Sequence, residues 1–330
     1  MKILIFHPVR LPPKNYGGTE RVVLWLSKGL KEMGHDVWVA ASAGSALPDG
    51  VQLIGMEKEK NSLLDLLSRL PDGLDVIHFM APPEEKILNH LPCPSLLTVH
   101  GNGELGEEFI RNSVFLSQDH AKRHHAEVFV YNGIDPAEYL FTPAEKKNWY
   151  LFFSKTNWRV KNLSGAIRLC TQESVPLCIA GGNRPVWTRL MTLVKKNMVW
   201  KGPLSGVDKA LLFAQAKALI FPVCWPEPFG LVVAEALMSG TPVLATRRGS
   251  LSELVSQNVG MLFDSDRDER WSDYLCMTQL PWDPYACRER AMSCFHYKKM
   301  AEQYLQLYRR ISSGENLHTK APKAGDWRRE

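Results

Sequence analysis

This sequence has no hydrophobic run long enough to cross a membrane or to form the core of a signal peptide. The first apolar stretch, Ile3 to Phe6, is interrupted at once by His7 and Pro8, whereas a membrane-spanning helix needs about 20 apolar residues. Cysteines with ligand or redox spacing are also missing, because the seven cysteines are scattered from Cys93 to Cys294 without a C-x-x-C pair. Unpaired, unclustered thiols are typical of a reducing compartment. We therefore expect a cytoplasmic protein.

Several motifs that would indicate other enzyme classes are absent as well. The sequence contains no G-x-S-x-G and no G-x-x-x-x-G-K-[ST], the spacings typical of serine hydrolases and P-loop nucleotidases. It has no H-E-x-x-H and no cluster of cysteines and histidines with zinc-ligand spacing. We therefore expect no metal, no dinucleotide and no other cofactor.

What remains is the composition of an ordinary two-domain globular protein. The chain has 330 residues, of which 45% are hydrophobic and 23% charged, and a typical domain has about 100 to 200 residues. Residues 1–150 carry 15 basic and 19 acidic side chains, while residues 151–330 carry 25 basic and 16 acidic ones. The basic second half suits a phosphate-bearing ligand or peripheral contact with an anionic membrane, although basic residues also occur simply as a solvated face. Nothing in the composition indicates a nucleic-acid partner.

In the first half, short apolar runs alternate with helical segments. An amphipathic helix is expected at residues 19–33, closed by Gly34. The expected strands cover residues 2–7, 37–41, 76–80, 96–99, 114–116 and 128–131. Strands that alternate with helices indicate a parallel, doubly wound sheet.

The second half repeats this pattern after a polar segment at residues 142–148. The expected strands cover residues 150–154, 177–180, 198–200, 218–222 and 242–245, and a final amphipathic helix is expected at 297–311. We predict a first Rossmann-like, acceptor-side domain at 1–145, a second Rossmann-like, donor domain at 146–312, and a polar, disordered tail at 313–330.

The sharpest motif runs from Pro226 to Val243 and reads PEPFGLVVAEALMSGTPV. Gly230 is expected to open a helix, Gly240 to end it, and Pro242 to bar its continuation. The first amides of such a helix have no partner within it, so they offer a site for phosphate or ribose oxygens. These amides belong to Phe229, Gly230, Leu231 and Val232.

Two glutamates, Glu227 and Glu235, accompany the start of this helix. Either carboxylate alone could simply favour the helix dipole, by about 0.3 to 1 kcal/mol. Together, around Pro-Phe-Gly and before Ser-Gly-Thr-Pro, they resemble the E-x7-E signature of glycosyltransferase family four, whose members have the GT-B fold. In other Rossmann sites acidic residues bind ribose hydroxyls, and Glu235 is expected to do so here.

Other landmarks of that family occur in the expected order along nearly the whole chain. Gly17-Gly18 looks like its N-terminal glycine pair, where missing side chains let the backbone approach a pyrophosphate, although a Gly-Gly is also a common tight turn. His100 ends an expected strand at its carboxyl edge, where ligands of open α/β sheets bind. The similarly placed histidine of the family faces the donor sugar, so the resemblance implies that His100 stabilises the transition state. His78 is a second, less favoured candidate.

The loop after the first strand of the second half carries cations that the resemblance assigns to the donor pyrophosphate. The family usually has Gly-Arg followed by Lys, whereas Ser154-Lys155 stands in the Gly-Arg place and the loop is longer. Lysine binds phosphate as a point charge but lacks the bidentate fork of arginine. Lys155 or Arg159 thus supplies the first cation, and Lys161 the second.

The resemblance implies an α/β fold of the GT-B type, with two Rossmann-like, doubly wound domains facing across a cleft. It also implies that the C-terminal helix packs back on the first domain. Gly181 and Gly202 follow strands of the second domain and resemble the loops that line the nucleotide. The implied activity is metal-independent, retaining hexosyl transfer from a UDP- or GDP-linked sugar to an acceptor hydroxyl, with His100, Lys161 and Glu227 as catalytic residues.

Two other functions stay open at this point. A sugar-nucleotide epimerase would use similar domains and change the sugar without an acceptor, and a non-catalytic protein would only bind the nucleotide sugar. The acceptor can be a glycan, a lipid-linked sugar or a small molecule. Residues 8–16 and 82–89 are the loops expected to contact it.

Overall fold

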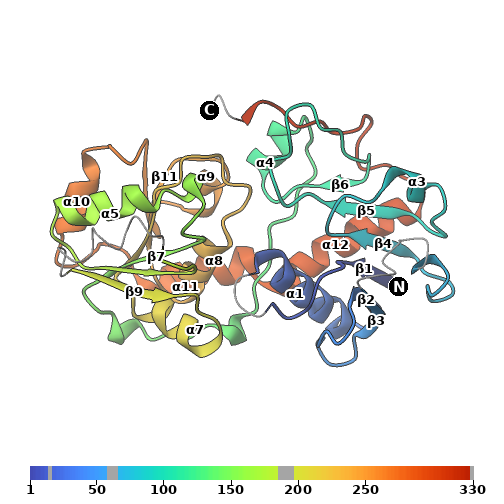
Figure 1. Ribbon diagram of the computed structural model, residues 1–330, viewed down its shortest axis with the longest axis horizontal. Coiled ribbons are helices and arrows are strands. Elements are labelled where there is room, and N and C mark those ends of the chain that lie inside the picture. Colours follow the sequence, from blue (N-terminus) through green and yellow to red (C-terminus); the bar gives the residue numbers. More distant parts are fainter. Residues whose placement is uncertain (14–16, 58–65, 185–196, 328–330) are drawn as a thin grey trace. The chain divides into compact units, whose positions relative to one another are not determined.

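A computed structural model of the protein describes residues 1–13, 17–57, 66–184 and 197–327. The chain forms two compact units, the first made of Met1–Ile134 with His296–Arg329 and the second of Asp135–Phe295. Each unit contains one six-stranded sheet in which all the strands are parallel (Figure 1). The chain therefore passes from one unit to the other twice.

The first unit has the strand order β3-β2-β1-β4-β5-β6. Its strands are β1 (Lys2–Phe6), β2 (Asp36–Ser42), β3 (Gln52–Met56), β4 (Val76–Phe79), β5 (Ser95–Thr98) and β6 (Ser113–Val114). Its helices are α1 (Gly18–Glu32), α3 (Glu85–Leu88), α4 (Gln118–Arg123) and α12 (Tyr297–Ser312). The order reverses between β1 and β4, and in doubly wound sheets this switch point is where ligands bind.

Helices α1 and α12 pack tightly against each other in the first unit. A Cβ atom added to Gly29 of α1 would lie 2.9 Å from the Cβ of Ala301 in α12, so the absence of a side chain permits this close approach. On the sheet face beneath α12, the His78 ring lies 4.7 Å from that of Tyr304. The C-terminal helix thus belongs to the first unit, as the fold prediction expected.

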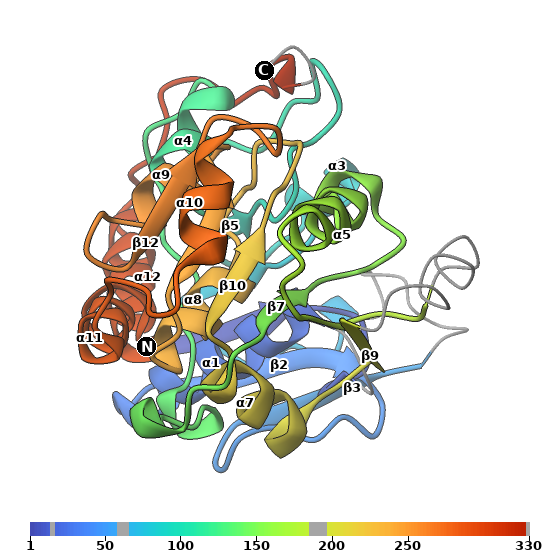
Figure 2. The same ribbon diagram turned by 90° about the vertical axis from the view of Figure 1, so that its left-hand side faces the viewer.

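The second unit has the strand order β12-β11-β10-β7-β8-β9. Its strands are β7 (Tyr150–Phe153), β8 (Leu177–Ala180), β9 (Met198–Gly202), β10 (Ala218–Phe221), β11 (Val243–Thr246) and β12 (Gly260–Phe263). Its α-helices are α5 (Leu163–Gln172), α7 (Gly206–Gln215), α8 (Leu231–Met238), α9 (Leu251–Leu254), α10 (Arg270–Cys276) and α11 (Pro284–Phe295). Short 3-10 turns occupy η1 (Pro136–Glu138), η2 (Pro143–Glu145) and η3 (Arg159–Lys161). Helices α5 and α10 share one hydrophobic core with the sheet and cover the same face of it (Figure 2).

The expected fold of two Rossmann-like α/β units is confirmed, with differences in detail. The structure adds two strands that the sequence did not predict, β3 and β12. The run 128–131, predicted as a strand, makes only an isolated bridge between Phe129 and Phe115. None of the described helices combines the length and apolar character that a membrane crossing requires.

The division between the units lies at Ile134, earlier than the predicted boundary after residue 145. The intervening residues adhere to the second unit because their aromatic side chains are anchored there. The Tyr139 hydroxyl donates a hydrogen bond of 2.9 Å to Glu235, and the Phe141 ring lies directly against Gly240.

The prediction of a disordered tail is wrong for residues 313–327. This segment runs along the first unit and exchanges backbone hydrogen bonds with it, including Gly106 N to Ala324 O at 2.8 Å and Ala324 N to Glu107 O at 2.9 Å. Ala324 is buried in the core. The polar composition of the tail conceals this packing because backbone groups and a few small side chains make most of the contacts.

Candidate functional site

The helix of the predicted signature, α8, begins and ends at the expected glycines. Gly230 precedes its first residue with a φ of 85°, and Gly240 follows its last turn with a φ of 68°. Both values lie in the left-handed region that favours glycine. The amides of Leu231 and Val232 lie in the first turn, where backbone donors have no partner within the helix. The Phe229 carbonyl accepts a hydrogen bond from the Ser250 hydroxyl at 2.7 Å, which fixes the approach to the helix.

Glu227 and Lys161, two of the predicted catalytic residues, form a buried ion pair. Lys161 Nζ lies 2.6 Å from Glu227 Oε2, and the two residues are 7% and 6% exposed. The Trp225 indole donates its N–H to the same oxygen at 2.7 Å, and its ring centroid lies 4.8 Å from Lys161 Nζ. Since a buried charge without its partner is strongly destabilising, these three side chains hold one another in place.

The backbone of Glu227 is held by the turn after β11. Ser250 N donates to Glu227 O at 3.0 Å, and a Cβ on Gly249 would lie only 2.4 Å from Glu227 N. Gly249 has a φ of 58°, so both its conformation and its surroundings require glycine.

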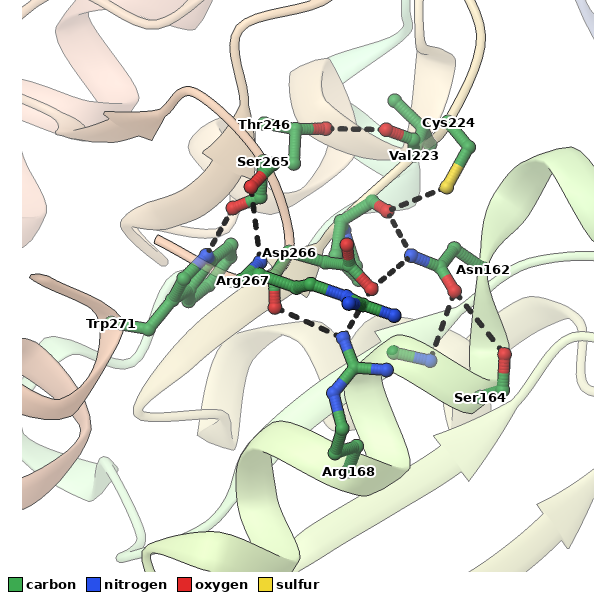
Figure 3. A network of polar contacts seen from close by, with 12 residues as sticks. Asn162, Ser164, Arg168, Val223, Cys224, Thr246, Ser265, Asp266, Arg267 and Trp271 are labelled. Atoms are coloured by element: carbon green, nitrogen blue, oxygen red, sulfur yellow. Dashed lines mark hydrogen bonds and ion pairs between the residues drawn. The ribbon is translucent and has the colours of Figure 1, made fainter. Parts of the chain in front are cut away.

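A second set of polar contacts braces the turn that carries Lys161 (Figure 3). Asn162, in the left-handed conformation, donates from Nδ2 to Pro222 O at 2.9 Å and to Asp266 Oδ2 at 3.0 Å. Its Oδ1 accepts from Gly165 N at 2.9 Å and so caps α5. Arg168 also contacts the Asp266 carboxylate. Partial burial acts to raise the pKa of Asp266, but the hydrogen bonds from Asn162 and Arg168 outweigh it and hold this pKa below its usual value.

Further contacts in Figure 3 join the loops at the carboxyl ends of neighbouring strands. The Thr246 hydroxyl donates to Val223 O at 2.7 Å, and the Trp271 indole donates to Ser265 O at 2.9 Å. Through Asn162, the turn after Lys161 is anchored to Pro222 at the end of β10 and to Asp266 in the loop after β12.

Of the two candidates for the first cation, Lys155 is the one whose contacts connect it with Trp225 and the Lys161–Glu227 pair. Lys155 Nζ lies 4.4 Å from the Trp158 ring centroid, and the Trp158 ring meets the Trp225 ring edge to face at 6.3 Å. Arg159 is exposed at the start of η3. The aromatic pair was not anticipated from the sequence, although Trp225 precedes Glu227 by two residues.

Glu235 lies in a different, buried ion pair. Its Oε1 accepts from Lys209 Nζ at 2.6 Å and from the Tyr139 hydroxyl at 2.9 Å, and the residue is 1% exposed. The sequence did not indicate Lys209 or Tyr139 as partners. The structure thus gives this carboxylate a stabilising role within the second unit, and its contact with ribose stays a prediction.

Gly181 and Gly202 bring the carboxyl ends of three adjacent strands, β7, β8 and β9, together. Gly181 N donates to Gly202 O at 3.0 Å. A Cβ on Gly181 would lie 2.8 Å from Ser154 N, and its φ is 94°. The residue before Lys155 is therefore packed directly against the loop that was predicted to line the nucleotide.

In the first unit, Gly17 caps α1 and Gly18 begins it. A Cβ on Gly17 would lie 2.6 Å from the Cβ of Pro13, so the glycine permits the strand-to-helix loop to fold back on the helix. The predicted acceptor loop 8–16 is described only as far as residue 13. The other acceptor loop, 82–89, contains α3.

His78 and His100 differ in their surroundings. Both ring nitrogens of His78 have hydrogen-bond partners, the Tyr308 hydroxyl at 2.7 Å from Nδ1 and Thr98 Oγ1 at 2.7 Å from Nε2. The Nε2 atom of His100 is buried and has no hydrogen-bond partner among the described residues. Burial lowers the pKa of both histidines to about 3. These contacts make His78 a structural residue and leave His100 as the candidate for ligand contact.

One motif in the sequence is at odds with the expectation of no dinucleotide cofactor. Gly101, Gly103 and Gly106 form a G-x-G-x-x-G. That fingerprint requires a helix to open at the motif. Here the motif follows β5, but the next helix, α4, begins only at Gln118. The backbone of the loop is instead held by His120 Nε2, at 2.9 Å from Gly101 O.

Asp264, Asp266 and Asp268 have the spacing of Asp-x-Asp motifs, which can bind metal ions. This spacing is at odds with the expectation of no metal. Their carboxylates pair with arginines: Asp266 with Arg168, and the other two with Arg270. In the part of the chain that the structure describes, no three acidic, histidine or cysteine side chains are grouped so that they could hold a metal ion.

The fold has close counterparts among solved structures. A glycosyltransferase involved in Avilamycin A biosynthesis superposes with a TM-score of 0.79 at 23% identity, covering 95% of this chain and 98% of that one. The Anabaena protein HepE, in complex with UDP and glucose, superposes with a TM-score of 0.68 at 17% identity over 93% and 98% of the two chains.

Sequence relatives match shorter segments. An uncharacterised 41.2 kDa protein in the cps region of Klebsiella pneumoniae is 31% identical over 119 residues, 35% of this chain and 33% of the relative. A D-inositol 3-phosphate glycosyltransferase of Arthrobacter is 38% identical over 74 residues, 22% of this chain and 17% of the relative. The matches thus span a third or less of these relatives' lengths. The model of the family described as glycosyl transferases group 1 matches residues 140–276, a segment that contains Lys161, Glu227 and Glu235.

Proposed function

We propose that this protein is a glycosyltransferase that moves a sugar from a nucleoside diphosphate, UDP or GDP, to an acceptor hydroxyl. The observation that carries the proposal is the buried Lys161–Glu227 ion pair, with the half-buried Trp225 bonded to it, beside the start of α8. It combines a fixed cation and a fixed carboxylate with the first-turn amides of the signature helix, which have no partner within that helix. The solved HepE complex, which contains UDP and glucose, supports a donor of this class.

The donor diphosphate would contact the cations and the helix start. An ammonium group has three N–H donors, and the ion pair with Glu227 uses one of those of Lys161, so two remain for phosphate oxygens. Lys155 would act as the first cation, because its contact with Trp158 places it beside the same aromatic pair. The Leu231 and Val232 amides would add neutral donors.

Catalysis would follow from the growth of negative charge on the leaving diphosphate. Fixed donors stabilise the transition state more than the bound substrate because the charge is larger there. The cations would take the part that a metal ion plays in other transferases, and so we propose metal-independent transfer without a cofactor.

We propose retention of configuration, through an oxocarbenium-like transition state and without a protein nucleophile. Glu227 Oε2 accepts two hydrogen bonds, from Lys161 and Trp225, and such bonds reduce the electron density available for attack on carbon. Its carboxylate is better suited to binding a sugar hydroxyl. The acceptor would then attack from the face that the diphosphate leaves, and a glycan, a lipid-linked sugar or a small molecule could serve.

The test is donor binding and turnover by the purified protein with UDP- and GDP-linked sugars, in the presence of EDTA. Lys161→Ala should abolish both, whereas Lys147→Ala, which removes the same charge from an exposed position of the same unit, should preserve both. Binding without turnover for any acceptor would favour a binding protein, and a changed sugar without an acceptor would favour an epimerase. Failure to bind any nucleotide sugar would contradict the proposal.

A further inference from the structure

His7 lies at the switch point of the first sheet. It follows β1 directly, between the neighbours β2 and β4, and its backbone N–H donates to Ala40 O at 2.9 Å. Side chains alternate along a strand, and Leu4 and Phe6 belong to the core cluster on one face. The His7 side chain therefore continues the opposite face, to which His78 and Thr98 also point.

The His7 imidazole is buried without a partner. It is 8% exposed, yet neither Nδ1 nor Nε2 has a hydrogen-bond partner among the described residues. The Nε2 atom of His100, which follows β5 on the same sheet, shares this property. Buried polar groups are nearly always hydrogen-bonded, so each exception requires an explanation such as a functional role.

Other buried histidines of this unit show that the fold readily satisfies such rings. His120 uses Nδ1 for Leu116 N at 3.2 Å and Nε2 for Gly101 O at 2.9 Å. His124 has a carbonyl oxygen beside each ring nitrogen, His120 O at 2.7 Å from Nδ1 and Asn102 O at 3.0 Å from Nε2, and its N–H donates to one of them. His7 and His100 depart from this pattern, and both lie at the carboxyl ends of their strands.

The chemistry of these two rings selects the ligand. Burial lowers the pKa of His7, and the nearby Glu20 only partly offsets this, while the pKa of His100 falls to about 3. Both rings are therefore neutral at physiological pH. A neutral imidazole offers one donor and one acceptor, which matches a hydroxyl group and matches a phosphate poorly.

We propose that His7 is a ligand-contacting residue, which forms with His100 a site for sugar hydroxyls on the first unit. The hydroxyls belong either to the sugar being transferred or to the acceptor. This inference rests on the proposed transferase function. It assigns a role to a residue that the sequence shows only as an interruption of the first apolar run.

The test compares His7→Phe with His78→Phe and measures both thermal unfolding and transfer. His7→Phe should leave the unfolding midpoint unchanged or raise it, because no partner is lost, while kcat/KM for transfer falls about tenfold or more. His78→Phe should lower the midpoint, because the Tyr308 hydroxyl loses its partner and the Thr98 hydroxyl keeps only the Tyr304 hydroxyl. His7→Gln, which retains a donor and an acceptor, should recover part of the transfer activity.

Two further measurements locate the hydroxyl. Slower donor hydrolysis by His7→Phe in the absence of acceptor would place it on the donor sugar, and a raised acceptor KM with unchanged hydrolysis would place it on the acceptor. Binding of the nucleoside diphosphate alone should be unchanged, because its proposed ligands Lys155 and Lys161 belong to the second unit. Wild-type transfer rates in His7→Phe, or a midpoint lowered as far as in His78→Phe, would overturn this inference alone. Absence of any transfer by the unmutated protein would overturn the proposed function with it.

Discussion

The indole of Trp225 donates its N–H to Glu227 Oε2, the same oxygen that Lys161 Nζ contacts. One aromatic residue thus holds both members of the ion pair, through its N–H and through its ring face. Trp225→Phe retains a ring beside Lys161 but removes the hydrogen bond to the carboxylate. Hydrogen bonds to charged groups contribute about 1.5 to 3 kcal/mol, so we expect kcat/KM for the nucleotide sugar to fall about 10- to 100-fold.

The matched control for this prediction is Trp158→Phe. Trp158 is 43% exposed and contacts Lys155 by its ring alone, a contact that phenylalanine can retain. Steady-state kinetics should therefore show a much smaller loss. Equal effects of the two substitutions would mean that the Trp225 N–H does not position Glu227.

The Lys161–Glu227 pair predicts a separation of stability from activity. Lys161→Met leaves the Glu227 carboxylate buried without its cation, which should lower the free energy of unfolding by about 3 to 5 kcal/mol. Adding Glu227→Gln removes the unpaired charge and should restore much of this loss, while transfer stays abolished. Urea unfolding of the two single variants and the double variant measures the coupling. A double variant no more stable than Lys161→Met would show that the pair is not electrostatically coupled.

Two glycines with nearly the same φ allow a test of the close approach to Glu227. Gly249 has a φ of 58° and Gly206 a φ of 57°. A Cβ added to Gly249 would lie 2.4 Å from Glu227 N, whereas a Cβ added to Gly206 would have no atom within 4 Å. Gly206→Ala should cost about 1 to 2 kcal/mol, the strain of the left-handed conformation. Gly249→Ala should cost more and should also reduce transfer, because the added methyl displaces the Glu227 backbone. Equal stability of the two variants in urea would contradict this.

The sequence predicted those strands and candidate site residues that are marked by a local pattern of neighbouring residues. Most strands were predictable because fully buried parallel strands are short apolar runs. Strand β3 was missed because it begins with Gln52 and the exposed Leu53, and it is recognisable only once β2 pairs with it. Motif spacing singled out Glu227 and Lys161 as candidate site residues, but it did not predict the ion pair between them.

Residues that act through contacts between distant loops could not be found in this way. Asp266 meets Asn162 across 104 positions of the sequence, so no local pattern connects them. His7 is visible in the sequence, but its lack of hydrogen-bond partners among the described residues is a property of the folded sheet. Lys209 resembles any helical lysine until its contact with Glu235 is seen.

The Asp266 carboxylate should give a pH-dependent contribution to stability. Its folded pKa lies below the unfolded value of about 3.9, so the unfolded state binds more protons at low pH. The stabilisation is therefore present above about pH 4 and is lost as the pH falls through the folded pKa. Asp266→Asn should be less stable than the unmutated protein at pH 7, and the difference should shrink below pH 4. Urea unfolding at several pH values measures it, and a difference that does not vary with pH would contradict an electrostatic origin.

The ordered tail predicts a link between the C-terminus and the loop that follows His100. The Trp327 indole donates to Gly103 O at 3.0 Å, and Lys323 N and Gly325 N donate to the end of α4. Deletion of residues 314–330 should therefore expose the amides of residues 103–109 to exchange, because Gly106 N and Phe109 N lose their acceptors. Hydrogen exchange measures this directly, with the second unit as an internal control. Transfer should slow while nucleoside diphosphate binding stays unchanged, since the tail belongs to the first unit and the proposed diphosphate ligands to the second. Unchanged protection of Gly106 and Phe109 after the deletion would mean that the tail rests on this loop without ordering it.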